Sequence, residues 1–86
     1  MPLSPAANKI VELGQRLYGD QWQSPFARMT GLSQAYISKI AAGDRPVTDA
    51  VHDAVTAGLK AESKRLRAQA DELRAMWNDY VTRNLA

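Results

Sequence analysis

The chain has 86 residues, 45% of them hydrophobic, and its 11 basic and 9 acidic side chains leave a net charge of +2. This length suits one small domain, and the absence of cysteine excludes disulfides and thiolate metal sites and points to a reducing cytoplasm. No apolar run approaches the roughly 20 residues that cross a membrane, and the N-terminus lacks the charged start and apolar core of a signal peptide.

The positive charge is unevenly distributed along the chain. Residues 1–47 carry five basic and three acidic side chains, whereas residues 48–86 carry six of each. A basic excess favours an anionic partner, so we expect such a partner to meet the first half of the chain.

The first helix is predicted from a cap and a proline. Ser4 suits the N-cap position, and Pro5 suits the first helical position because its missing N–H has no helical partner there. We expect this helix to run from about Pro5 to Tyr18 and to end at Gly19. Its apolar face consists of Ile10, Leu13, Gly14 and Leu17. Trp22, in the connection that follows, is expected to fill the core.

Two short helices joined by a tight glycine turn are predicted next. Ser24 suits the N-cap of the first and Pro25 its first helical position, and Gly31 ends it where the chain needs a positive φ. Ser33 then caps the second helix, and Gly43 ends it. Two helices with so short a turn cross steeply, which leaves the second free to project into a groove.

The second of these helices has two distinct faces. Its apolar stripe consists of Ile37, Ile40 and Ala41. The opposite face is small, polar and basic and consists of Gln34, Ala35, Ser38 and Lys39. Tyr36 lies on the border between them. Such a face suits close approach to a ligand, but it is also what an ordinary solvated helix presents.

Several features of this segment occur together in one known family. They are Ala27 in the first helix, Gly31 and Leu32 at the turn, Gln34, Ile37 and Ile40 in the second helix, and the trailing loop 42–46. In this order and spacing they resemble the helix-turn-helix of the Cro/lambda-repressor-like, or XRE-type, DNA-binding regulators. The match covers about 25 of the 86 residues. Thr30 departs from the pattern, since the family usually places an apolar residue there.

The resemblance implies which residues would meet DNA. The second helix would enter the major groove, where Gln34 can pair with adenine, Lys39 with guanine, and Ala35 with a thymine methyl. The expected base contacts are Gln34, Ala35, Ser38 and Lys39. The expected phosphate contacts, which set register without reading sequence, are Gln23, Arg28, Ser33, Tyr36 and Arg45. Arg45 is equally compatible with a simply solvated side chain.

A further helix is predicted after the loop that contains Arg45. Thr48 suits its N-cap, and its apolar stripe consists of Val51, Val55 and Leu59. His52 stands alone, so we expect it to be structural and expect no metal site. We assign residues 1–58 to a helix-turn-helix DNA-binding domain.

Residues 59–86 are assigned to a C-terminal helix that we expect to be a dimerisation element. Apolar residues recur at every seventh position, and further ones widen the stripe: Leu59, Leu66, Leu73, Met76, Trp77 and Tyr80. Gly58 is a candidate break, so the sequence leaves open whether this helix continues the preceding one. The stripe could fold back on its own chain or pair in a homodimer. We favour the homodimer, in an antiparallel or crossed contact, because Glu62 and Gln69 are too polar for a good parallel zipper.

The sequence thus predicts an all-α protein, a helix-turn-helix bundle of about five helices with a long amphipathic C-terminal helix. No catalytic set, cofactor site or small-molecule effector domain is evident, so we do not expect an enzyme. We expect a cytoplasmic, nucleoid-associated regulator that binds double-stranded DNA as a homodimer on an inverted repeat, as a small repressor of its own operon does. The alternative is a protein–protein interaction module that uses this fold without DNA binding.

Overall fold

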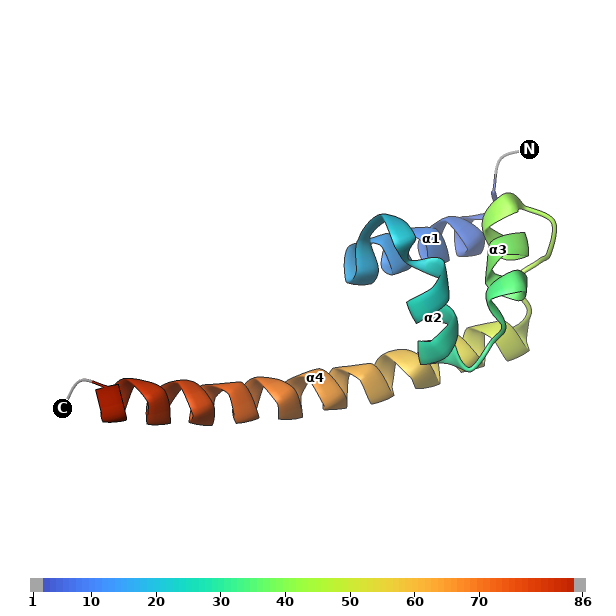
Figure 1. The fold of residues 1–86 in the computed structure, drawn as a ribbon. Coiled ribbons are helices and arrows are strands. Elements are labelled where there is room, and N and C mark those ends of the chain that lie inside the picture. The colour runs from blue at the N-terminus through green and yellow to red at the C-terminus, as the bar shows by residue number, and fades with distance from the viewer. Residues whose placement is uncertain (1–2, 85–86) are drawn as a thin grey trace.

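The computed structural model describes residues 3–84, and within this range the chain is all-helical. The elements are α1 (Pro5–Tyr18), a short 3₁₀ turn η1 (Gly19–Gln21), α2 (Gln23–Thr30), α3 (Gln34–Ala42) and α4 (Asp49–Asn84) (Figure 1). The all-α prediction with a long C-terminal helix is confirmed. The expected number of about five helices is one too many, because the last two predicted helices are a single helix, α4.

Helix α1 has the predicted bounds because both of its ends are fixed locally. The Ser4 hydroxyl accepts a hydrogen bond from the Ala7 N–H at 3.1 Å, and Gly19 ends the helix with φ 77°. The expected apolar face is shifted slightly along the helix. Ala7 is buried, whereas Leu17 is 39% exposed.

The turn between α2 and α3 also forms as predicted. Gly31 adopts the left-handed conformation with φ 77° and ψ 9°, and the Ser33 hydroxyl accepts from the Tyr36 N–H at 3.1 Å. Gly43 ends α3 in the same left-handed conformation, with φ 85°.

The prediction that Ser24 caps α2 is wrong, because α2 begins earlier in the chain. Trp22 already has helical backbone angles, so Ser24 lies inside the first turn, where its hydroxyl accepts from the Arg28 guanidinium at 3.0 Å. Trp22 occupies the N-cap position and is buried, as predicted for a core residue. Burial of the indole, rather than a capping hydroxyl, therefore determines where α2 starts.

The core lies where α1, α2 and α3 meet the N-terminal part of α4 (Figure 1). Phe26, Ile37 and Ile40 are fully buried, and the ring of Trp22 meets that of Phe26 edge to face with their centroids 5.5 Å apart. Helix α4 contributes its predicted stripe, of which Val51 and Val55 are buried and Leu59 is half-buried. Within the described residues, the buried hydrophobic core consists of Ala7, Ile10, Trp22, Phe26, Ala27, Ile37, Ile40, Val51 and Val55.

Helix α4 passes through Gly58 without a break. A Cβ atom on Gly58 would lie 2.7 Å from the carbonyl oxygen of Met29, so the glycine allows the end of α2 to approach α4 closely. The predicted boundary between residues 58 and 59 therefore lies inside one helix. The part of α4 that packs against the core extends past this boundary to Leu59 and Glu62, and the exposed part begins at Ser63.

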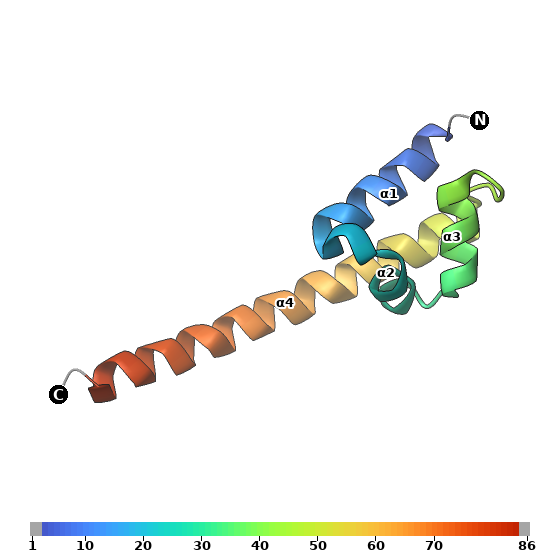
Figure 2. The ribbon, with the colours of Figure 1, turned by 45° about the horizontal axis from the view of Figure 1, so that its top comes forward.

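Beyond the core, α4 leaves the rest of the molecule. We call residues 63–84 the arm; every residue from Ser63 to Tyr80 is exposed. The molecule measures 61 × 23 × 20 Å, and its radius of gyration of 17.3 Å exceeds the roughly 12 Å of a compact chain of this length. Figure 2 shows the arm pointing away from α1, α2 and α3. Leu59, the first residue of the predicted dimerisation stripe, packs against the core of its own chain, whereas the five later residues of the stripe do not fold back on it.

Candidate nucleic-acid interface

A shallow hollow of about 260 Å³ lies at the N-terminal ends of α2 and α3. It is lined by Asp20, Gln21, Gln23, Ser24 and Gln34. The packing of α2 against α3 brings Gln23 and Gln34 to this one surface. A predicted phosphate contact and a predicted base contact thus lie side by side.

The N-terminal ends of α2 and α3, which border the hollow, also contribute to its electrostatics. Helix N-termini carry unpaired N–H groups and a partial positive charge, both of which favour anions. No side chain caps the start of helix α2, where Trp22 occupies the N-cap position. At α3, by contrast, the Ser33 hydroxyl already caps the Tyr36 N–H.

The outward face of α3 is as predicted. All four expected base-contacting residues are exposed: Gln34, Ala35, Ser38 and Lys39. Tyr36 is half-buried at the border, and Ile37 and Ile40 are fully buried on the opposite side. The apolar side of α3 is therefore held by the core, and the polar side is free for a ligand.

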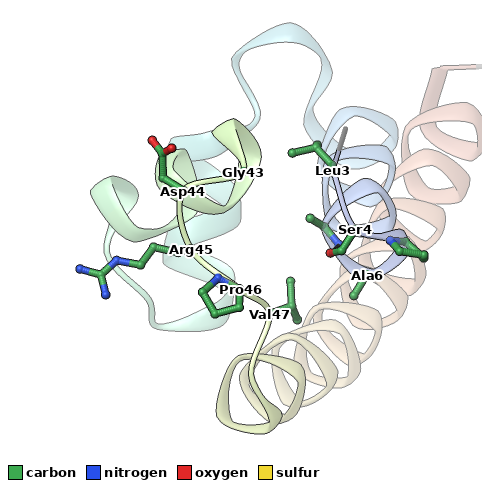
Figure 3. Close-up of a pocket in the computed structure, with 10 residues that line it drawn as sticks. Leu3, Ser4, Ala6, Gly43, Asp44, Arg45, Pro46 and Val47 are labelled. Carbon is green, nitrogen blue, oxygen red and sulfur yellow. Dashed lines mark hydrogen bonds between the residues drawn. The ribbon is translucent and has the colours of Figure 1, made fainter. Parts of the chain in front are cut away.

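Two of the expected phosphate contacts carry a guanidinium. Arg28 is exposed one turn along α2 from the hollow, where its hydrogen bond to Ser24 orients it. Arg45 lies in the loop after α3. That loop and the N-terminal segment line a cleft of about 640 Å³, and Figure 3 shows the Arg45 side chain extending away from Leu3 and Ser4 on the opposite wall.

Two acidic residues, Asp20 and Asp44, also lie near these side chains, and the position of Asp20 does not follow from the sequence alone. Asp20 lines the hollow with Gln23 and Gln34, although it is 14 positions from Gln34 and on no shared periodicity with it. Only the folded arrangement of η1, α2 and α3 reveals its position. Its carboxylate opposes a phosphate there. Asp44, beside Arg45, similarly reduces the local positive charge.

The described residues contain no group of three or more His, Cys, Asp or Glu side chains that could hold a metal ion. In the same part of the chain, no helix is long and apolar enough to cross a membrane. His52 is exposed on α4.

No protein-family model, curated protein or solved structure that we compared with the chain matches it. The resemblance to the Cro/lambda-repressor-like group therefore depends on the sequence features given above.

Proposed function

We propose that this protein is a sequence-specific double-stranded DNA-binding regulator, and specifically a small dimeric repressor of its own operon. The observation that carries the proposal is the hollow in which Gln23, Ser24 and Gln34 meet beside an uncapped helix N-terminus. A phosphate bound at the start of α2 would place Gln34, at the start of α3, at the adjoining base edges.

Each part of this surface has a distinct role in the proposal. Gln34 donates to and accepts from adenine, Lys39 donates to guanine, and Ala35 contacts a thymine methyl. Ser38 donates to a base or to a phosphate. The residues that position the backbone are Gln23, Arg28, Ser33, Tyr36 and Arg45. These residues are on the half of the chain that carries the net positive charge.

Selection from a random double-stranded DNA pool tests the proposal. We expect an enriched inverted repeat that the Gln34→Ala/Lys39→Ala variant no longer selects. The matched control is Gln15→Ala/Lys60→Ala, which removes the same two side-chain types from exposed positions on α1 and α4 and should select the wild-type site. No enrichment at low salt would overturn the proposal and favour the interaction module.

Salt dependence provides a second test of the same surface. Each phosphate contact that is lost should reduce the slope of log affinity against log salt by about one. We therefore expect Arg28→Ala and Arg45→Ala each to weaken binding to all sequences and to flatten the slope. An unchanged slope would remove that arginine from the interface.

A further inference from the structure

The arm presents a row of large apolar side chains to solvent. Their exposed fractions are 43% for Leu66, 58% for Leu73, 61% for Met76, 64% for Trp77 and 68% for Tyr80. The arm points away from the rest of its own chain, so none of the helices in the bundle covers this row (Figure 2). An apolar row of this size on an exposed helix is typical of a binding surface.

The spacing within the row is that of a coiled-coil seam. Leu66, Ala70, Leu73, Trp77 and Tyr80 are separated alternately by four and three residues. Ser63 extends the same pattern toward the core. Along this seam the small side chains lie near the start of the arm and the aromatic ones near its end.

We infer that the arms of two copies pair antiparallel, with the twofold axis between Ala70 and Leu73. This register places Trp77 of each copy against Leu66 of the other, and Leu73 against Ala70. Tyr80 lies against Ser63, where its hydroxyl has a polar neighbour. The inference deepens the proposed function, since it specifies how the regulator would dimerise.

Side-chain size favours this orientation over the parallel one. In a parallel pair, identical residues share a layer, so two Trp77 side chains would crowd one layer while two Ala70 side chains would leave a gap in another. Overpacked layers and voids both destabilise a packed interface. The antiparallel register instead places one large and one smaller side chain in every layer from Ser63 to Tyr80.

Charge and area indicate a weak dimer. Arg67 and Arg74 of opposite copies approach each other beside the seam, and Asp71, one turn from both, offsets their repulsion. The five exposed apolar side chains offer roughly 600 Å² per copy, so a pair buries roughly 1,200 Å², at the lower limit of stable interfaces. We expect a dissociation constant of about micromolar size.

The antiparallel pair also sets the distance between two DNA-reading surfaces, if the proposed function holds. Val51 lies in the same core as α3 and is about 20 residues from the twofold axis. At about 1.5 Å per residue, the two reading surfaces lie roughly 60 Å apart, close to two turns of B-DNA. A parallel pair would place them much closer together.

Cysteine cross-linking of the full chain tests the register without DNA, since the natural sequence has no cysteine. Ser63→Cys/Tyr80→Cys should form disulfide-linked dimers under mild oxidation. Each single variant should cross-link about tenfold more slowly, because in this register neither residue lies near its own counterpart. Circular dichroism confirms that each variant keeps the helical content of the wild type.

The outcomes separate the alternatives. Fast cross-linking of both single variants would show a parallel pair and overturn the inference. A chain that sediments as a monomer up to about millimolar concentration, with no cross-linking of the double variant, would also overturn it. Neither result bears on whether the surface of α3 binds DNA. The inferred pairing of the arms can therefore be overturned while the proposed DNA binding stands.

Discussion

Gly14 of α1 lies directly against the indole of Trp22. A Cβ atom on Gly14 would lie 2.0 Å from Cε3 of the indole ring, far inside van der Waals contact. Trp22 is in turn 4% exposed and meets Phe26 edge to face. The absence of a side chain at Gly14 is therefore what allows α1 to cover the tryptophan that starts α2.

Gly14→Ala should destabilise the protein, although alanine favours a helix. Alanine gains about 1 kcal/mol of helix propensity, but displacing the indole costs more, and we expect a net loss of about 1–3 kcal/mol. Urea unfolding followed by tryptophan fluorescence measures it. The exposed neighbour Gln15 supplies the control, since Gln15→Ala should change stability by less than about 0.5 kcal/mol. A Gly14→Ala variant more stable than the wild type would contradict the observed packing.

Gly58→Ala distinguishes a tightly packed α4 from a simple helix break. The new Cβ would lie 2.7 Å from the Met29 carbonyl oxygen and 3.2 Å from the Thr30 Cα, and backbone atoms cannot rotate away. We expect a loss of about 1–3 kcal/mol, measured by thermal unfolding. If α4 were not held against α2, alanine would raise stability by about 1 kcal/mol instead. The sign of the change in stability therefore shows whether α4 is packed tightly against α2 at Gly58.

The two glycines show which features the sequence could predict. Caps and turns depend on neighbours within four residues, so Ser4, Ser33 and Gly31 were assigned correctly from the chain alone. At Gly58 the sequence predicts only a possible break, because the need for glycine there comes from a contact with Met29, far away in sequence. The sequence context of Ser24 favours an N-cap, but the burial of Trp22 overrides that local preference.

The candidate site was predictable to a similar extent. The outward face of α3 follows from helical periodicity, so the exposure of Gln34 and Lys39 was expected. The meeting of Gln23 with Gln34 and the presence of Asp20 beside them depend on how η1, α2 and α3 pack. No sequence period links these three positions.

Thr30→Val should destabilise the turn, even though the resemblance favours an apolar residue there. The Thr30 hydroxyl donates to the Ala27 carbonyl at 3.1 Å and accepts from the Leu32 N–H at 3.3 Å. Valine has nearly the same shape but leaves the partly buried Leu32 N–H without this acceptor, at a cost of about 1–2 kcal/mol. Thr30→Ser keeps the hydroxyl and should retain more stability in urea unfolding than Thr30→Val. The reverse order would show that the methyl group matters more than the hydrogen bonds.

Tyr18 should make the free energy of unfolding depend on pH in the alkaline range. Its hydroxyl donates to Glu62 at 3.4 Å, where α1 meets the base of the arm. Burial, and then the Glu62 carboxylate, raises the pKa of Tyr18 above 10.0. Because the folded state holds the proton more tightly than the unfolded state, this contribution is complete below pH 10 and is lost as pH rises through the folded pKa.

Stability measured from about pH 8 to about pH 11 tests this linkage. We expect the wild type to lose stability above pH 10 more steeply than Tyr18→Phe, so the two curves converge. Tyr36→Phe, which leaves Tyr18 in place, should keep the steep decline. Parallel curves for the wild type and Tyr18→Phe would show that the contact with Glu62 does not hold the proton.

Asp20→Asn should tighten DNA binding, because Asp20 lines the hollow in which Gln23 and Gln34 meet. A carboxylate there repels an incoming phosphate, and an exposed charge of this kind contributes about 0.3–1 kcal/mol, so we expect about two- to fivefold higher affinity at low salt. Glu72→Gln makes the same change in net charge on the arm, at an exposed position outside the seam. It should improve affinity much less, which separates a local effect from a general increase in positive charge.

Both variants are compared by fluorescence anisotropy on the selected DNA at several salt concentrations, and the advantage of Asp20→Asn should shrink as salt rises. Equal effects of the two variants would place the phosphate elsewhere on the molecule and would count against the hollow as the point where DNA is held.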